Sequence, residues 1–275
     1  APGGKVGNEL IDDAAAALEA GLNVASGLHE RLRDQPRLDA LAKARGLKLF
    51  DVRDPPAGLA VGKGHPRPGR RLLTVGTDCS VGKMYATLAL ARSLRERGIP
   101  ARFRATGQTG ILIAGEGVAV DAVVADFISG AIEQLAPASH DGGWDLIEGQ
   151  GSLFHPSFAG VSLGLLHGAQ PEALVLCHEP GRSEMRGISG RRPPDLALCL
   201  LRNLEAARLT SPQVRAAGVC LNTSAMAEDA AKRLCAVTAA QLDLPCTDPM
   251  RFGVEAVIDH LLCLEPSSPS TIASR

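Results

Sequence analysis

The chain has 275 residues, of which 45% are hydrophobic, 21% are charged and 3% are aromatic, and its formal net charge is −1. These values are ordinary for a soluble globular protein, and a near-neutral chain with few aromatic side chains is a poor candidate for binding nucleic acid. No apolar run approaches the roughly 20 residues that span a bilayer, and the seven cysteines, with no C-x-x-C pair among them, indicate reduced thiols in a cytoplasmic protein rather than disulfides or a zinc site.

The first 53 residues alternate between helix and strand patterns. An alanine-rich stretch with helical spacing covers 9–20, and a short strand pattern follows at 21–26. A second helix is expected at 35–45 and a second strand at 47–52. This alternation predicts part of a Rossmann-like domain with parallel strands over 1–53. Because the pattern starts abruptly and without Met, we expect this domain to be truncated.

A longer alternation of strand and helix patterns follows over residues 71–264. Residues 54–70 separate the two alternations and hold four prolines and four glycines, which is typical of a linker. The pattern predicts an α/β domain built on a parallel sheet, followed by a flexible tail at 265–275. The expected strands cover 72–75, 101–106, 144–147, 173–177 and 217–221, and expected helices cover 121–135, 228–242 and 254–262.

A glycine-bounded loop follows the first strand of this larger domain. Glycines allow backbone N–H groups to wrap round an anion, and the N-terminus of the next helix then faces the negative charge. The strand–loop–helix context is what a phosphate-binding loop requires. With five residues between its glycines instead of four, the loop resembles that of dethiobiotin synthetase and its P-loop relatives. Its sequence is Gly76-Thr77-Asp78-Cys79-Ser80-Val81-Gly82-Lys83.

The residue after Lys83 departs from the common pattern of such loops. Most have Ser or Thr there, whose hydroxyl binds Mg²⁺, whereas this chain has Met84, and a thioether is a poor ligand for that hard cation. The loop can still hold phosphates, but the usual arrangement for Mg-dependent phosphoryl transfer lacks one part. Asp78 or Glu148 could compensate, and the residues alone leave this open. We expect the Lys83 side chain to be exposed.

Two candidates for a general base lie at or just after the strand 144–147. In open α/β sheets the ligand lies beyond the carboxyl ends of the strands, where Glu148 stands. The glycines on either side of Gln150 leave room for a ligand. Glu148 or His155 could therefore take up a proton near neutral pH. The alternatives are a carboxylate satisfied by backbone amides and a structural histidine.

Polar side chains that suit an acidic substrate follow several of the expected strands. An arginine can bind a carboxylate through two hydrogen bonds; a solvated arginine on a surface turn is the alternative. Asn222, after the strand 217–221, either reads the edge of a base or caps a turn. The histidines lack the spacing of metal ligands, so no metal is expected. The predicted substrate-binding residues are Arg104, Thr106, Gln108, Gln150, His178 and Arg182.

Six segments, taken in order, resemble one bacterial and archaeal family. Its members pair an N-terminal Rossmann-like domain with a C-terminal P-loop domain, and most have no assigned function. One branch is D-glutamate N-acetyltransferase, a cytoplasmic enzyme of D-amino-acid catabolism. The resemblance covers about residues 1–262 and implies a P-loop NTPase-like domain after the Rossmann-like one. The segments are GTDCSVGKMY, RATGQTGILIAG, DAVVADFISGA, IEGQGSLFHP, LVLCHEPGR and LNTSA.

The resemblance implies a transferase that moves acetyl from acetyl-CoA to the amine of D-glutamate or a similar acidic amino acid. Coenzyme A carries a pyrophosphate and a 3′-phosphate, so a phosphate loop without the Mg²⁺ hydroxyl is compatible with it. We expect Glu148 or His155 to be the base and backbone amides near 149–151 to stabilise the oxyanion. Arg104 or Arg182 would hold the substrate carboxylate.

Two other functions fit the same loop. An ATP-dependent ligase or kinase is suggested by the dethiobiotin-synthetase-like spacing, with Mg²⁺ bound by Asp78 and Glu148, although Met84 argues against it. A nucleotide-binding regulator without catalysis is the third interpretation. In each case we expect a small-molecule ligand and self-association into a homo-oligomer, without nucleic acid or membrane.

Overall fold

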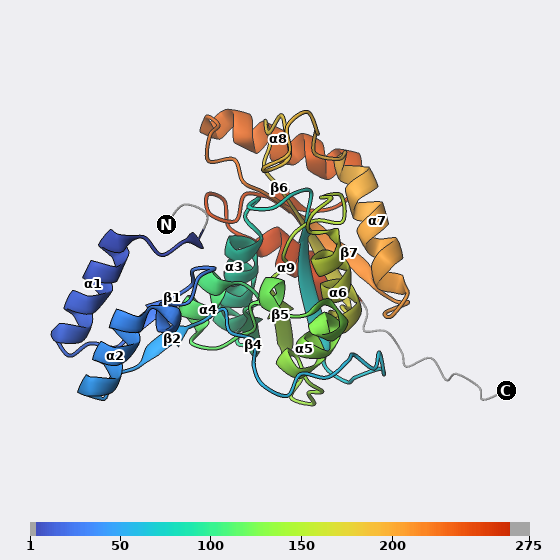
Figure 1. The fold of residues 1–275 in the computed structure, drawn as a ribbon. Helices are drawn as coiled ribbons and strands as arrows, with labels where there is room; N and C mark the ends of the chain where they lie inside the picture. Colours follow the sequence, from blue (N-terminus) through green and yellow to red (C-terminus); the bar gives the residue numbers. More distant parts are fainter. Residues whose placement is uncertain (1–3, 265–275) are drawn as a thin grey trace. The chain divides into compact units, whose positions relative to one another are not determined.

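The computed structural model describes residues 4–264, and the expected tail lies outside the described residues. The chain forms two compact units (Figure 1), which are described separately: Ala1–Gly58 with Ala105–Val123, and Leu59–Arg104 with Val124–Arg275. The sequence patterns assigned all of 71–264 to one domain. In the structure, the segment 105–123 groups by its contacts with the first unit.

The first unit is a small α/β arrangement around two parallel strands. β1 pairs in parallel with β2, which confirms the Rossmann-like pattern. Leu18 and Leu38, from two different helices, are fully buried in its core. Its elements are α1 (Asn8–Glu19), β1 (Val24–Ser26), η2 (Leu32–Asp34), α2 (Pro36–Arg45), β2 (Leu49–Asp51), α4 (Gln108–Ala114) and η3 (Val120–Ala122).

The second unit is built on a six-stranded sheet in which every neighbouring pair is parallel. The strand order is β4-β5-β3-β6-β7-β8, so the central strands are covered on both faces and are almost wholly buried. The strands are β3 (Arg70–Gly76), β4 (Ala101–Arg104), β5 (Trp144–Ile147), β6 (Ala173–His178), β7 (Arg215–Leu221) and β8 (Cys246–Thr247).

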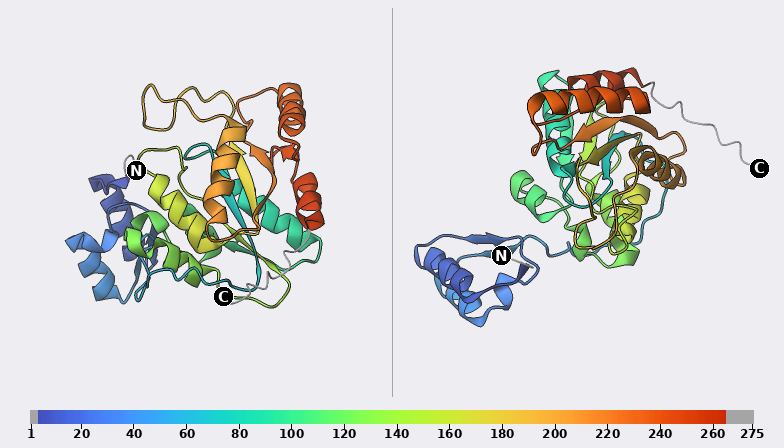
Figure 2. Two further views of the ribbon diagram at one scale, coloured as in Figure 1. Left: turned by 90° about the vertical axis from the view of Figure 1, so that its right-hand side faces the viewer. Right: turned by 90° about the horizontal axis from the view of Figure 1, so that it is seen from above.

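Helices cover both faces of this sheet. Figure 2 shows α3 and α9 together on one face and α5, α6 and α7 on the other, while α8 packs beside the edge strand β8. The core between α3, α9 and the sheet is formed by Leu90, Leu94, Val257 and Leu261, among others. The helical elements are α3 (Lys83–Glu96), η4 (Ala125–Phe127), α5 (Ile128–Leu135), α6 (Ala159–Ala169), α7 (Leu196–Arg208), α8 (Glu228–Leu242) and α9 (Glu255–Cys263).

The strand order places the ligand-binding edge of the sheet. The chain runs from β3 outward to β4, returns through β5, and then crosses to β6 on the other side of β3. In open α/β sheets this reversal leaves a crevice at the carboxyl ends of the strands, and ligands bind there. The phosphate loop follows β3 and therefore lies at the switch point.

Two sequence predictions about helices are corrected. The single helix expected at 121–135 is broken, because Val123 and Val124 are extended and separate η3 from η4. The helix α6 was not anticipated, since glycines at 160, 164 and 168 lower helix propensity. The fold explains these glycines: a Cβ at Gly168 would lie 2.4 Å from the carbonyl oxygen of Ser129, so only glycine permits the close packing of α5 on α6.

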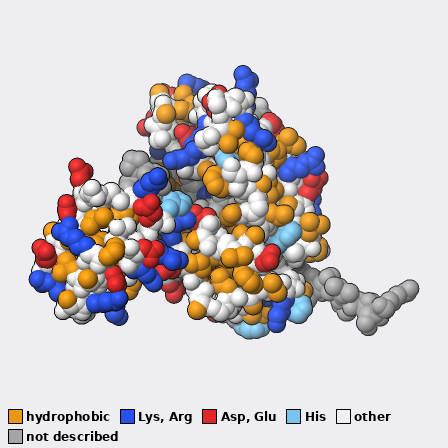
Figure 3. All heavy atoms as spheres, viewed as in Figure 1, with side chains coloured by type: hydrophobic (Ala, Val, Ile, Leu, Met, Phe, Trp, Pro, Cys, Tyr) orange, Lys and Arg blue, Asp and Glu red, His pale blue; other side chains and the backbone are white. Residues whose placement is uncertain are grey.

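The chain has nearly equal numbers of basic and acidic residues, and the visible surface of the first unit carries both kinds. On the face seen in Figure 3, acidic and basic side chains are interspersed over the first unit rather than gathered by sign. Within residues 4–264, none of the helices combines the length and the apolar character needed to cross a bilayer.

Candidate functional site

The phosphate loop closes tightly on itself at the end of β3. Gly82, the residue before α3, has φ 96°, and Ser80 has φ 55°, a left-handed conformation that is uncommon for a residue with a Cβ. A Cβ at Gly76 would lie 2.9 Å from Val81 Cγ2 and 3.1 Å from Lys83 Nζ. The predicted glycines are therefore required by the shape of the loop, and the helix after it begins at Lys83.

Lys83 is buried, which corrects the expectation of an exposed side chain. It is 6% exposed, and its Nζ donates to the carbonyl oxygens of Asp78 at 2.7 Å and Gly151 at 2.9 Å. Burial lowers its pKa, because the charged form loses its hydration. The amino group thus lies inside the loop and links the phosphate loop to the turn after β5.

An ion pair fastens a second segment to the phosphate loop. Arg182, on the segment after β6, donates from Nη1 to Asp78 Oδ2 at 2.6 Å and to the Cys79 carbonyl at 2.7 Å. The backbone N–H of Arg186 donates to the same carboxylate oxygen at 2.7 Å. Burial alone would raise the pKa of Asp78, but the bonds from Arg182, Arg186 and Cys79 outweigh burial and lower this pKa. Asp78 is therefore a charged anchor within the protein.

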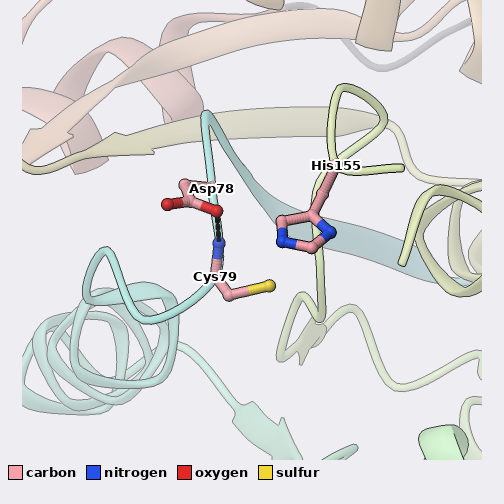
Figure 4. A group of neighbouring side chains, drawn as sticks. All are labelled: Asp78, Cys79 and His155. Carbon is pink, nitrogen blue, oxygen red and sulfur yellow. Dashed lines mark hydrogen bonds between the residues drawn. The ribbon is translucent and has the colours of Figure 1, made fainter. Parts of the chain in front are cut away.

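Three side chains with metal-ligating atoms meet beside this anchor. Asp78, Cys79 and His155 place one such atom each within 4.8 Å of the others, and the Cys79 thiol points toward the imidazole (Figure 4). Both Asp78 oxygens already accept hydrogen bonds from the protein. Burial raises the pKa of the Cys79 thiol, although Lys83 opposes this, so the thiol stays protonated. A metal ion would have to displace these bonds.

The imidazole of His155 is held from both sides by the backbone. Its Nδ1 accepts from the N–H of Ser157 at 3.2 Å, so Nε2 carries the proton and donates to the Arg186 carbonyl at 3.0 Å. The side chain is 1% exposed. His155 could act as a base only after breaking the bond to Ser157, and its present contacts are those of a residue that joins three loops.

Glu148 lies where the sequence placed it, just past β5. It is 4% exposed, and its Oε1 accepts from Gln150 Nε2 at 3.1 Å. The N–H of Gly149, one of the amides expected to stabilise the oxyanion, donates to Thr74 Oγ1 at 3.0 Å and is therefore engaged within the protein. Because Gly151 accepts from Lys83, the turn that carries Glu148 lies directly against the phosphate loop.

His178 forms another contact with the loop. This last residue of β6 shares a hydrogen bond of 2.8 Å between its Nδ1 and Thr77 Oγ1. Burial lowers the pKa of His178, and the charge of Arg182 adds to this, while Glu179 opposes it. The imidazole is therefore neutral near pH 7, which is the form that can accept a proton.

The other predicted substrate-binding residues are engaged elsewhere or belong to the first unit. Arg104 Nε donates to the buried carboxylate of Asp145 at 2.9 Å, so its charge is already paired. Thr106 and Gln108 belong to the first unit, where Gln108 begins α4 and accepts from Arg53 at 3.4 Å. Glu148, Gln150, His155, His178 and Arg182 all belong to the second unit with the phosphate loop.

A pocket of about 390 Å³ adjoins the opposite side of the loop. It lies past the ends of β7 and β8, and most of its lining was missed because it comes from three separate segments. Val81 and Gly82 were predicted as part of the phosphate loop, and Asn222 was a candidate because it follows a strand; the other lining residues were not predicted. The lining residues are Val81, Gly82, Tyr85, Cys220, Leu221, Asn222, Ser224, Asp248, Pro249, Met250 and Arg251.

Comparisons with known proteins agree with the fold and the resemblance. Residues 1–55 match the DUF1611_N Rossmann-like domain, and residues 59–258 match the DUF1611_C P-loop domain, both described as domains of unknown function. Two proteins named D-glutamate N-acetyltransferase, from Pseudoalteromonas sp and Tritonibacter scottomollicae, are each 47% identical over 259 residues, which is 94% of this chain and 78% of theirs.

A solved structure gives the same result. The crystal structure of a DUF1611 family protein from Anabaena variabilis is 38% identical, with a TM-score of 0.88, and the match covers 95% of this chain and 77% of that one. Both domains and the chain as a whole are thereby accounted for, and the chain belongs to the DUF1611 family, with its N-terminal Rossmann-like and C-terminal P-loop domains.

Proposed function

We propose that this protein is an N-acetyltransferase that moves acetyl from acetyl-CoA to the amine of D-glutamate or a similar acidic amino acid. The observation that carries the proposal is the 47% identity, over 94% of the chain, to relatives with that name. The match covers nearly the whole chain rather than one motif. With the activity go our expectations of a cytoplasmic, homo-oligomeric enzyme of D-amino-acid catabolism.

The phosphate loop supports coenzyme A as the acetyl donor. Its glycine backbone and the buried Lys83 suit a pyrophosphate, and a phosphate oxygen would offer Nζ an acceptor in place of the Asp78 and Gly151 carbonyls. Met84 supplies no hydroxyl for Mg²⁺. Asp78, which could have compensated, is held by Arg182 and Arg186. These contacts favour phosphate binding without phosphoryl transfer.

The reaction requires a base for the acceptor amine. The amine nitrogen attacks the thioester carbonyl carbon and the carbon–sulfur bond breaks. The proton lost by the amine passes to a base and from the base to the sulfur, so that coenzyme A leaves as the thiol. Glu148 is our proposed base because it lies beside the lysine-bound turn at the switch point. His155 is the second choice, since its Nδ1 already accepts from Ser157.

The acceptor would be held by polar groups near that turn. Gln150 and the neutral His178 remain the proposed contacts, because both lie in the unit that carries the phosphate loop. Arg104 and Arg182 are proposed only in a lesser role. Each is already paired, with Asp145 and Asp78 respectively, and would have to share its guanidinium with the substrate carboxylate.

Magnesium dependence tests the proposal against its main competitor. Acyl transfer moves no phosphoryl group, so release of thiol from acetyl-CoA with D-glutamate should proceed unchanged in EDTA. We expect N-acetylglutamate as the product, detected by mass spectrometry. If thiol release is absent and ATP is consumed only with Mg²⁺, the protein is instead an ATP-dependent ligase or kinase. Binding of nucleotide without any product would favour the regulator.

A further inference from the structure

The 390 Å³ pocket beside the phosphate loop has no role in the chemistry described so far. We propose that it binds the adenosine of coenzyme A, and that Arg251 recognises the 3′-phosphate on the ribose and so distinguishes the coenzyme from ATP. The inference rests on the proposed use of acetyl-CoA. It adds a nucleoside site and a residue that determines which nucleotide is accepted.

Position is the first argument. Val81 and Gly82 belong to the phosphate loop and also line the pocket, so the two sites share a wall. The backbone is open there, because even a Cβ at Gly82 would meet only Asn222 Cβ, at 3.7 Å. A ligand whose diphosphate lies in the loop can therefore extend past Gly82 into the pocket. One side of the diphosphate of coenzyme A carries adenosine, and we assign that side to the pocket.

The walls suit a flat aromatic base. Tyr85, on the first turn of α3, is 55% exposed, and Met250 is 68% exposed. Phenol rings and thioethers both stack on aromatic systems, and stacking on a base tolerates solvent at its edges. Asn222 supplies hydrogen bonding: its Oδ1 accepts from the Ser224 N–H at 3.3 Å, and its Nδ2 can donate to a ring nitrogen.

The pocket is held open by a buried carboxylate. Asp248 Oδ2 accepts from the N–H and hydroxyl of Thr223 at 2.8 and 2.6 Å, while Oδ1 accepts from the N–H of Met250 at 2.9 Å and of Arg251 at 3.2 Å. These bonds join the loop after β7 to the loop after β8. The two walls are therefore fixed before a ligand arrives, which reduces the entropy lost on binding.

Arg251 places a fixed positive charge in this pocket. Its Nη1 donates to the carbonyls of Thr223 at 2.9 Å and Met226 at 3.0 Å, and its guanidinium lies 5.5 Å from the ring centroid of Phe252. In the part of the chain that the structure describes, no carboxylate forms an ion pair with it. One edge of the guanidinium is thus anchored, and the other nitrogens can donate to a phosphate.

The chemistry of the ligand decides what that phosphate is. In coenzyme A, the ribose between the diphosphate and the base carries a phosphate on its 3′ oxygen, whereas ATP and ADP carry a hydroxyl there. A cation in the wall of the pocket, as Arg251 is, can therefore contact a group that only the coenzyme has. Charge-assisted hydrogen bonds of this kind change affinity by about 10- to 100-fold.

Calorimetry with coenzyme A and dephospho-coenzyme A, which lacks only the 3′-phosphate, tests the assignment. The unmodified protein should bind coenzyme A about 10- to 100-fold more tightly. Arg251→Gln should remove that preference and leave the affinity for dephospho-coenzyme A unchanged, which also shows that the variant is folded. Lys232→Gln is the matched control: its Nζ lies 5.6 Å from the same Phe252 ring but does not line the pocket, so the preference should survive.

The outcomes separate this inference from the proposed function. Equal affinity for the two coenzymes in a protein that still acetylates D-glutamate overturns the role of Arg251 alone. An equal loss of affinity for both in Arg251→Gln makes the residue structural and also overturns it. Tyr85→Ala should weaken both coenzymes alike while sparing acetyl-pantetheine, a donor without the nucleotide, as substrate. If Tyr85→Ala binds both normally, the pocket is not the nucleoside site.

Discussion

The two sides of the phosphate loop differ in how fully their polar groups are satisfied. On the side of β5 and β6, Asp78, His155 and Arg182 bond to one another's segments, and almost every donor and acceptor is matched within the protein. On the side of β7 and β8, the wall is largely apolar, Tyr85 is exposed, and Arg251 is anchored through Nη1. The comparison teaches that charged residues near a phosphate loop need not contact the ligand; some of them hold the loop.

Removing the ion pair between Arg182 and Asp78 should have the largest effect on stability. Arg182→Met leaves Asp78 charged, buried and without its ion-pair partner, which costs roughly 3 kcal/mol of the free energy of unfolding. Urea denaturation measures this loss. Adding Asp78→Asn should restore part of it, because no charge then remains unpaired. Arg202→Met, which removes an exposed arginine paired with an exposed Glu205, is the control and should cost little. A small effect of Arg182→Met would show that the ion pair is not an anchor.

Measuring turnover separates the two candidate bases, Glu148 and His155, on the side of β5 and β6. Glu148→Gln keeps the size and most hydrogen bonds of the side chain but removes its basicity. Turnover should fall by about 10²-fold or more with a modest change in KM, since a general base contributes that much. His155→Gln should mainly lower stability, because both imidazole nitrogens bond to backbone. If Glu148→Gln turns over normally and His155→Gln does not, the base is His155.

The smallest expected effect is the dependence of stability on pH. The pKa of Asp78 is lowered in the folded protein, so the folded state holds fewer protons on this group than the unfolded state does near pH 4. Its contribution to stability is therefore complete above the ordinary pKa near 3.9 and is lost as pH falls through the lower folded value. Between pH 5 and pH 2, Asp78→Asn should lose less stability than the unmodified protein, as measured by urea denaturation. Parallel losses would contradict the lowered pKa.

Local sequence patterns were sufficient for the strands β3 to β7, the phosphate loop and the position of Glu148, but not for the short edge strand β8. Each depends on neighbours in the chain: an apolar run, two glycines with a lysine, or a carboxylate at a strand end. The partners of these residues were not predictable in this way. Arg182 meets Asp78 from 104 residues away, and Lys83 is buried only because Gly151, 68 residues later, folds over it. The pocket combines segments near residues 85, 222 and 250, which no local pattern connects.

Helix α6 could not be predicted because packing overrides the intrinsic preferences of its residues. Its glycines argue against a helix by intrinsic propensity, and packing overrules that preference, because the backbone of α5 lies too close for any side chain at Gly168. The helix expected at 121–135 is split where the chain passes from one unit to the other, between Val123 and Val124. Hydrophobic periodicity alone predicts neither helix α6 nor the break within 121–135.

Gly149 links the architecture of the sheet to the chemistry. A Cβ at this position would lie 1.7 Å from the carbonyl oxygen of Thr74 on β3 and 3.1 Å from Lys83 Cδ. Because glycine has no side chain, the turn that carries Glu148 can lie this close to Lys83. Even alanine would push the turn outward and separate the proposed base from the phosphate loop. Any substitution at Gly149 would therefore change both the position of Glu148 and the packing of the turn after β5 against β3.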